Sequence, residues 1–200
     1  MLITIEGLDG AGKTTLAAAL ADALRARGRD VELLREPGGV ALSERIRALV
    51  TDPALRVDPE AEALLYAAAR AQLVAERLRP LLEAGRTVLL DRFVDSSLAY
   101  QGAARGLGID AVRAINTFAT GGLVPDATLL LRIDPREGRA RQEGRGAPDR
   151  LERENEAFFA AIAGAYDALA ASEPNRFHVL DATAAPDSVL GAALAALDET

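Results

Sequence analysis

Residues 7–14 read Gly7-Leu-Asp-Gly-Ala-Gly-Lys-Thr14. This stretch follows a short apolar run at residues 2–6 and opens an alanine- and leucine-rich run with helical spacing at residues 13–27. A glycine-rich loop between a buried strand and a helix turns successive backbone N–H groups toward one point, and the helix N-terminus adds partial positive charge there. The pattern G-x-x-x-x-G-K-[ST] in this context therefore predicts a loop that binds the phosphates of a nucleoside triphosphate.

Lys13 and Thr14 supply the side chains that such a loop needs. Lys13 is the only lysine among 23 basic residues, and its compact ammonium group is expected to reach the β- and γ-phosphates of ATP. The Thr14 hydroxyl is expected to bind Mg²⁺. The residues expected to contact ATP are Gly7, Gly10, Ala11, Gly12, Lys13, Thr14 and Thr15.

The rest of the chain alternates short apolar runs with longer stretches of helical spacing. Strands are expected at residues 2–6, 31–34, 87–90, 127–133 and 177–180, and helices at 13–27, 60–83, 94–104, 109–119, 151–171 and 188–197, with a short one ending near 50. Continuous apolar strands between helices predict a parallel sheet that is covered on both faces. We therefore expect an α/β protein with the P-loop NTPase fold, in which a five-stranded parallel sheet carries helices on both faces. It should form a single domain over residues 1–200.

The composition argues against several classes of protein. The chain has 200 residues, a net charge of −7, no cysteine, and His178 as its only histidine. A zinc centre of His and Cys ligands is excluded by ligand count, and the negative charge argues against a general nucleic-acid binder. No apolar run is long enough for a membrane span. The absence of cysteine fits a reducing compartment, so we expect a cytoplasmic protein.

Two further motifs follow the second and third expected strands, Arg35-Glu-Pro-Gly-Gly39 and Asp91-Arg92. Parallel strands end at one edge of the sheet, so these side chains should meet the phosphate loop there. The Asp91 carboxylate can hold Mg²⁺, and two converging guanidinium groups suit a second phosphate group. Either arginine taken alone is also explained as an ordinary surface residue, because almost all of the 23 basic residues are arginines.

Three motifs of this chain, in this order, resemble the thymidylate kinase family. They are Ile5-Glu-Gly-Leu-Asp-Gly-Ala-Gly-Lys-Thr-Thr15, Arg35-Glu-Pro-Gly-Gly39 and Asp91-Arg-Phe-Val-Asp-Ser-Ser-Leu-Ala-Tyr-Gln101. Many kinases share the first motif, whereas the second and third in this order and spacing are highly specific. The resemblance spans nearly the whole chain. It implies a homodimeric enzyme that phosphorylates dTMP to dTDP with ATP and Mg²⁺, in the pathway to dTTP.

The resemblance also implies roles for side chains around the phosphate and sugar of the acceptor. Asp9, although it lies in the phosphate loop, is expected to contact the 3′-hydroxyl of dTMP. Arg35 and Arg92 are expected to hold the dTMP phosphate. Tyr100 is expected to crowd the 2′ position of the sugar and so to favour deoxyribose.

For the base, the segment of Tyr66 and Arg70 resembles the family segment in which an aromatic ring stacks on thymine and an arginine hydrogen-bonds its carbonyl group. A flat ring is well suited to stack on a base. Without the resemblance, Tyr66 would be interpreted as a core residue of an amphipathic helix. The resemblance makes Ser97 and Gln101 candidates for the thymine edge.

The arginine-rich stretch at residues 132–153 admits two interpretations. A solvated helix face with i,i+4 ion pairs explains part of the pattern. A lid over residues 135–150 that closes over ATP would supply charge to the transferring phosphoryl group, and residues 144–148 would supply its mobility. Thymidylate kinases place this charge in the phosphate loop or in the lid, and Gly10 and Ala11 are uncharged. The chain thus resembles the lid type, with Arg141 and Arg145 as candidates.

The residues expected to act in phosphoryl transfer are Asp9, Lys13, Arg92, Arg141 and Arg145. Because the acceptor is already a phosphate, catalysis requires positioning and charge stabilisation rather than a strong base. Two alternatives remain open. Another nucleotide or deoxynucleoside kinase would differ in its acceptor, and a P-loop NTPase switch module would bind a partner protein and transfer little phosphate.

Overall fold

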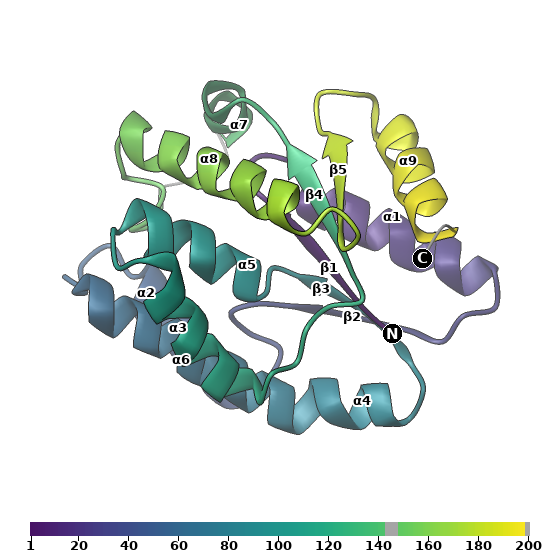
Figure 1. The fold of residues 1–200 in the computed structure, drawn as a ribbon, viewed down its shortest axis with the longest axis horizontal. Helices are drawn as coiled ribbons and strands as arrows, with labels where there is room; N and C mark the ends of the chain where they lie inside the picture. The colour runs from purple at the N-terminus through teal and green to yellow at the C-terminus, as the bar shows by residue number, and fades with distance from the viewer. Residues whose placement is uncertain (143–147, 199–200) are drawn as a thin grey trace.

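The computed structural model describes residues 1–142 and 148–198 and has the expected α/β architecture (Figure 1). The strands are β1 (Leu2–Gly7), β2 (Val31–Arg35), β3 (Thr87–Asp91), β4 (Ala127–Arg132) and β5 (Phe177–Asp181). They are all parallel, in the order β2-β3-β1-β4-β5. The predicted five-stranded parallel sheet is therefore confirmed.

The helices are α1 (Lys13–Ala26), α2 (Ala41–Thr51), α3 (Pro59–Leu73), the π-helix η1 (Val74–Leu78), α4 (Arg79–Glu83), α5 (Val94–Ser97), the π-helix η2 (Leu98–Ala104), α6 (Ile109–Thr120), α7 (Pro135–Gln142), α8 (Glu156–Ser172) and α9 (Pro186–Asp198). Two expected helices thus contain π-helical segments. The helix expected from residue 151 begins only at Glu156, because the Asn155 side chain accepts a hydrogen bond from the Phe158 N–H and caps that end.

Helices cover both faces of the sheet. In Figure 1, α1 and α9 lie on one face, and α8 and α5 lie on the other. Successive residues of a strand point to opposite faces, and β3 shows this directly. Leu89 packs in the same cluster as Leu20 of α1, whereas Val88 and Leu90 pack in a second cluster with Leu73 of α3. The central strands β1, β3 and β4 are mostly apolar because both of their faces are buried, whereas the edge strands β2 and β5 leave Leu33 and Val179 partly exposed.

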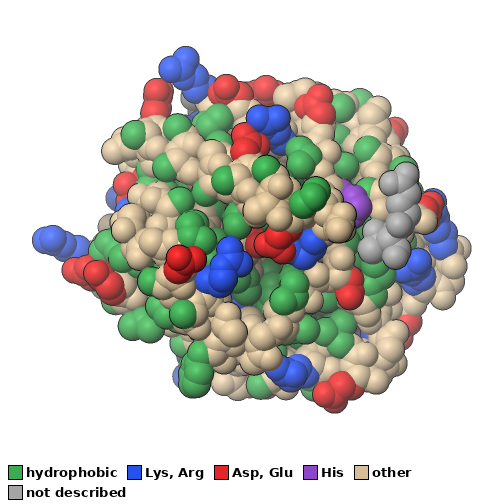
Figure 2. Space-filling model, viewed as in Figure 1, with side chains coloured by type: hydrophobic (Ala, Val, Ile, Leu, Met, Phe, Trp, Pro, Cys, Tyr) green, Lys and Arg blue, Asp and Glu red, His purple; other side chains and the backbone are tan. Residues whose placement is uncertain are grey.

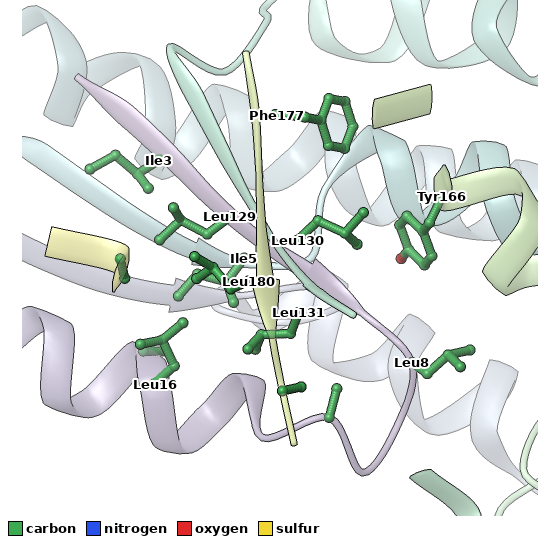
Figure 3. Close-up of a cluster of buried hydrophobic side chains, with 14 of the residues drawn as sticks. Ile3, Ile5, Leu8, Leu16, Leu129, Leu130, Leu131, Tyr166, Phe177 and Leu180 are labelled. Carbon is green, nitrogen blue, oxygen red and sulfur yellow. The ribbon is translucent and has the colours of Figure 1, made fainter. Parts of the chain in front are cut away.

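The largest hydrophobic cluster surrounds β1 and β4. Figure 3 shows Leu16 of α1 approaching Ile5 from one side of the sheet, while Leu130 points toward Tyr166 of α8 on the other side. Fully burying a side chain of this size contributes roughly 1.5–3 kcal/mol. The cluster thus fixes the carboxyl ends of β1 and β4, from which the phosphate loop and α7 depart.

Charged side chains of both signs are interspersed over the surface shown in Figure 2. This face therefore offers no extended basic area to a nucleic-acid backbone. Within residues 1–142 and 148–198, the helices are too short or too polar to cross a membrane.

A buried ion pair ties the start of β5 to α5. Arg176 donates from NH1 to Asp95 Oδ2 at 2.6 Å and from NH2 to Asp95 Oδ1 at 3.0 Å. The same guanidinium group donates to Thr128 Oγ1 at 2.7 Å and lies 4.4 Å from the centroid of the Phe177 ring. Because Asp95 is buried, its charge depends on Arg176 for compensation, whereas Arg176 also pairs with Glu173, to which its Nε donates at 2.8 Å.

We expect Arg176→Ala to lower the free energy of unfolding by about 3 kcal/mol, because Asp95 would keep a buried charge without its partner. Arg27→Ala is the matched control, since it removes the base of the exposed Arg27–Asp198 pair and should cost about 1 kcal/mol or less. Urea denaturation followed by circular dichroism measures both. Equal, small losses would contradict the structural importance of the buried pair.

Candidate active site

The loop between β1 and α1 has the geometry that its glycines predict. Gly10 and Gly12 have φ angles of 82° and 92°, which residues with a side chain rarely adopt. The Ala11 N–H donates to the Leu8 carbonyl at 3.2 Å and closes a turn. Lys13 Nζ donates to the same carbonyl at 2.9 Å, so its ammonium group lies along the inside of the loop.

A large space, here called the phosphate-loop cavity, opens beside this loop and has a volume of about 710 Å³. Most of the residues expected to contact ATP line it, namely Gly10, Gly12, Lys13, Thr14 and Thr15. Gly7 instead lines a neighbouring cavity beside β4 and β5, and Ala11 is buried. Arg139 and Arg153 also line the phosphate-loop cavity, although no role in binding was predicted for them.

Thr14 and Asp91, the two expected Mg²⁺ ligands, lie next to each other. Thr14 Oγ1 donates to Asp91 Oδ2 at 3.2 Å, which joins the start of α1 to the end of β3. Hydroxyl and carboxylate oxygens are hard ligands that suit Mg²⁺, so the pair fits this role. Within the described residues no group of three or more His, Cys, Asp or Glu side chains could hold a metal. The ion would therefore depend on phosphate oxygens and water for its other ligands.

Asp9 and Arg92 form an ion pair between the phosphate loop and the end of β3. Arg92 NH2 donates to Asp9 Oδ1 at 2.5 Å and to the Tyr100 hydroxyl at 3.2 Å. The Tyr100 hydroxyl donates to Asp9 Oδ2 at 3.3 Å. Burial alone would raise the pKa of Asp9, but the charges of Arg92 and Lys13 outweigh it and hold that pKa well below its ordinary value. Asp9 therefore stays ionised as an acceptor.

A buried carboxylate holds Arg92 in an unusual backbone conformation. Arg92 has a φ of 70°, a left-handed conformation that costs a residue with a side chain roughly 1–2 kcal/mol. Glu6 of β1 accepts hydrogen bonds from the Phe93 N–H at 2.8 Å and from Ser96 Oγ at 2.6 Å. Ser96 Oγ in turn accepts from Arg92 NH1 at 3.1 Å, and the Tyr166 hydroxyl donates to Glu6 at 2.8 Å. No role was predicted for Glu6 from the sequence, in which its place in the first motif was the only signal.

A second space, here called the acceptor cavity, has a volume of about 100 Å³. It is lined by most of the residues expected to bind dTMP, namely Asp9, Tyr66, Arg70, Arg92, Ser97, Tyr100 and Gln101. It shares Asp9, Glu36, Arg47 and Arg92 with the phosphate-loop cavity, so the two spaces adjoin. Arg35 lines the phosphate-loop cavity and is ion-paired with Glu44 at 3.0 Å.

Arg70 is buried, and its guanidinium group is engaged within the protein. It donates from Nε to Glu36 Oε2 at 2.7 Å, from NH1 to Ser97 Oγ at 2.9 Å, and from NH2 to the Phe93 carbonyl at 2.9 Å. NH1 also donates to Asn116 Oδ1. These contacts organise the wall of the acceptor cavity, and the expected contact of Arg70 with a thymine carbonyl stays a prediction.

Glu36 and Arg47 line both cavities, and neither was predicted from the sequence to be a functional residue. Arg47 NH1 donates to the Pro37 carbonyl at 3.1 Å. Glu36 Oε1 is buried and finds no hydrogen-bond partner among the described residues. Burial raises the pKa of Glu36 to about 7 in spite of Arg70, from an ordinary value of 4.5. The place of Glu36 in the second motif was a signal for this residue, whereas nothing in the sequence distinguishes Arg47.

Helix α7 packs directly against the phosphate loop through two glycines. A Cβ atom at Gly10 would lie 2.1 Å from the Gly138 carbonyl oxygen, and a Cβ atom at Gly138 would lie 2.9 Å from the Asp9 carbonyl oxygen. Both approaches are too close for any side chain. The loop and the helix therefore contact each other backbone to backbone, which requires glycine at both positions.

The arginines of α7 point in different directions. Arg139 lines the phosphate-loop cavity, and its guanidinium carbon lies 5.3 Å from the centroid of the Phe159 ring. Arg141 instead donates to the Ala182 carbonyl at 2.8 Å, beyond the end of β5. The structure therefore does not bring Arg141 to the phosphate loop as expected. Arg145, the other candidate, lies outside the described residues.

A phosphate loop whose cavity adjoins a second, arginine-lined cavity defines a class of protein, the P-loop kinases that act on a phosphorylated acceptor. Comparison with known proteins narrows this class. The family model described as thymidylate kinase matches residues 5–191. The chain belongs to the thymidylate kinase family.

Individual relatives agree with this assignment. The thymidylate kinase of Deinococcus radiodurans is 51% identical over 199 residues, which cover 100% of this chain and 97% of that protein. The thymidylate kinase of Bacillus licheniformis is 47% identical over 193 residues, or 95% of this chain and 91% of the relative. The crystal structure of thymidylate kinase from Ehrlichia chaffeensis matches with a TM-score of 0.82 at 29% identity, over 99% of this chain and 98% of that one. The predicted family and fold are confirmed.

We expect Gly10→Ala to lower kcat/KM for ATP about a hundredfold, because the new methyl group would push the phosphate loop away from Gly138 and misplace its N–H groups. Steady-state kinetics at varied ATP measure this. Gly164→Ala in α8, where a Cβ atom would meet nothing within 4 Å, is the control and should leave activity unchanged. If Gly10→Ala had wild-type kinetics, the close approach of Gly10 to Gly138 would not matter for activity.

We expect the pH dependence of stability to change in Glu36→Gln. An acid whose pKa is raised in the folded state loses stability as pH rises from its unfolded pKa to its folded pKa, here from 4.5 to about 7. Over that window the free energy of unfolding of the wild type should fall by about 3 kcal/mol relative to the variant. Urea titrations at several pH values measure this difference. Parallel pH profiles would be inconsistent with a raised pKa at Glu36.

Proposed function

We propose that the chain phosphorylates dTMP to dTDP with ATP as the phosphoryl donor, a step in the pathway to dTTP. The observation that carries this proposal is the junction of the phosphate-loop cavity and the acceptor cavity at Asp9 and Arg92. A donor phosphate and an acceptor phosphate in these two spaces would approach each other beside one guanidinium group. Membership of the thymidylate kinase family identifies the acceptor as dTMP.

On the donor side, the N–H groups of the phosphate loop and Lys13 would bind the ATP phosphates. Lys13 Nζ now bonds the Leu8 carbonyl, an interaction that it would exchange for the β- and γ-phosphates. Thr14 and Asp91 would hold Mg²⁺, which when bound neutralises phosphate charge. The contact between Thr14 and Asp91 already places both groups at the wall of the same cavity.

On the acceptor side, Arg92 would bind the phosphate of dTMP, with Arg35 contributing from the phosphate-loop cavity after it leaves Glu44. Asp9, which is held ionised, would accept a hydrogen bond from the 3′-hydroxyl group. Tyr100 lies against both Asp9 and Arg92 and would restrict the space at the 2′ position. Arginine suits this role because its fork of N–H groups matches phosphate oxygens.

The base would lie deeper in the acceptor cavity, against Tyr66, Ser97 and Gln101. Ser97 and Gln101 are almost completely buried, so an unsatisfied base edge would be costly there. Arg70 would act on the base through Ser97, to which it donates, or by sharing one of its N–H groups with the thymine carbonyl. These contacts are consistent with a pocket that selects its base by hydrogen bonding.

Positive charge for the transferring phosphoryl group would come from the arginine-rich segment, which we propose acts as a lid over residues 135–150. Arg139 already lines the phosphate-loop cavity. Arg141 would join it by releasing the Ala182 carbonyl, and Arg145 keeps its predicted role. The transition state spreads negative charge over the phosphoryl oxygens, and the backbone contact between Gly10 and Gly138 would keep α7 close to them.

A homodimer through α2, α3 and α6 is also part of this proposal. These three helices pack against one another in the order α2, α3, α6. They carry several exposed large apolar side chains, with exposures of 47% for Leu42, 48% for Leu49, 57% for Leu64 and 92% for Phe118. Exposed apolar side chains gathered on neighbouring helices favour burial against another protein surface.

The decisive measurement is ADP release by the purified protein with ATP and Mg²⁺ and one acceptor at a time: dTMP, dUMP, dCMP, dGMP, UMP or thymidine. We expect the fastest turnover with dTMP, slower turnover with dUMP and none with thymidine, because Arg92 requires a phosphate on the acceptor. Removal of Mg²⁺ with EDTA should abolish turnover.

Other outcomes of this experiment discriminate between the alternatives. If another monophosphate were preferred, the residues assigned to the base pocket would be wrong, but the protein would still be a nucleotide kinase. Turnover of thymidine instead of dTMP would indicate a deoxynucleoside kinase. ADP release that no acceptor raises above the level with ATP alone would favour a nucleotide-dependent switch.

A further inference from the structure

Glu62 of α3 is a completely buried carboxylate that binds three side chains. Its Oε1 accepts from Gln101 Nε2 at 2.8 Å and from Arg105 Nε at 3.3 Å. Its Oε2 accepts from Arg105 NH2 at 3.2 Å and from Arg150 NH2 at 2.5 Å. The two guanidinium groups offset the cost of burying its charge. The third partner, Gln101, also lines the acceptor cavity.

The contact with Glu62 decides which way the Gln101 amide faces. An ionised carboxylate only accepts hydrogen bonds, so only the NH₂ end of the amide can face it. The carbonyl oxygen Oε1 of Gln101 therefore lies at the other end, away from Glu62. The flipped amide would place Oε1 against the carboxylate, where two acceptors repel each other in a buried environment.

Ser97, on the same wall of the acceptor cavity, offers a hydrogen-bond donor where Gln101 offers an acceptor. Ser97 Oγ accepts from Arg70 NH1 at 2.9 Å, and a guanidinium N–H can only donate. The hydroxyl proton of Ser97 can therefore be donated to a further acceptor. With Oε1 of Gln101, the wall then offers one donor and one acceptor to a base. Thymine presents the complementary pair, the O4 acceptor and the N3–H donor, whereas cytosine presents an amino donor and an unprotonated N3.

We propose that Glu62 is a positioning residue for selection of the acceptor base. By directing Gln101 Oε1 toward the acceptor cavity, it favours a pyrimidine monophosphate that carries an N3–H group over a cytosine nucleotide. The inference rests on the proposed function, because it assumes a pyrimidine in the acceptor cavity. A mismatched base would leave buried polar groups unpaired, which is the usual source of strong discrimination by hydrogen bonding.

Glu62→Gln tests this role because it exchanges one oxygen for an NH₂ group of the same size. The Oε2 position accepts from Arg150 at 2.5 Å and from Arg105 at 3.2 Å, whereas the Oε1 position, besides Gln101, accepts one longer bond from Arg105 Nε at 3.3 Å. The new NH₂ group would therefore avoid the Oε2 position. It would occupy the Oε1 position facing Gln101, whose amide must then turn and present Nε2 to the acceptor cavity. We expect the ratio of kcat/KM for dTMP to kcat/KM for dCMP to fall about tenfold or more, chiefly through a higher KM for dTMP.

Two further variants separate a positioning role from a purely structural one. Gln101→Leu should lose the same discrimination, and the double variant Glu62→Gln/Gln101→Leu should be no less selective than Gln101→Leu alone, because Glu62 acts through Gln101. Glu154→Gln is the matched control. It disturbs Arg105, which donates to Glu154 at 2.5 Å, without touching the amide, so it should leave the dTMP-to-dCMP ratio unchanged.

The outcomes distinguish this inference from the function on which it rests. An unchanged dTMP-to-dCMP ratio in Glu62→Gln, with dTMP turnover by the wild type intact, would overturn the role of Glu62 alone. A wild type that fails to phosphorylate dTMP would overturn the proposed function and this inference together. If Glu62→Gln does not fold, Gln101→Leu tests the inference instead. An undiminished dTMP-to-dCMP ratio in that variant would show that Gln101 does not select the base, and Glu62 could then not act through it.

Discussion

The ion pair between Asp9 and Arg92 is the contact on which the arrangement of the site depends. Asp9 comes from the loop after β1 and Arg92 from the corner after β3, so the pair fastens together the two loops that separate the cavities. Arg92 reaches this position only with a left-handed backbone, which Glu6 holds by accepting from the Phe93 N–H. Contacts within the protein thus fix these two charges at the junction of the cavities, and charges that are fixed in advance stabilise a developing charge at low reorganisation cost.

Much of the fold was predictable because its signals are local. The strands are short and mostly apolar, and the phosphate loop needs glycine at two positions with positive φ angles. The residues that follow β1, β2 and β3 could be assigned to one edge because parallel strands end together. For the same reason Thr14 and Asp91, far apart in the chain, could be expected to meet, and they lie within hydrogen-bond distance.

The remaining features depend on packing between helices, which a single sequence does not reveal. Arg47 and Arg139 look like any other arginine, and only the positions of α2 and α7 bring them to the cavities. The π-helical segments depend on hydrogen bonds one residue longer than those of an α-helix, whereas the apolar spacing is that of an ordinary helix. The contacts of Arg70 with Glu36 and other protein acceptors likewise come from packing, while its expected contact with the base stays a prediction.

Lys13 is the only lysine of the chain, which has a practical consequence for chemical labelling of the protein. No other side chain carries an amine, and the N-terminal amine of Met1 donates to the Arg86 carbonyl. Lys13 is only 7% exposed, and burial together with the charge of Arg92 lowers its pKa. Among the side chains, Lys13 is therefore the single target of reagents that acylate amines, and it lies in the phosphate loop. Coupling the protein to a surface or a dye through lysine would label the site itself.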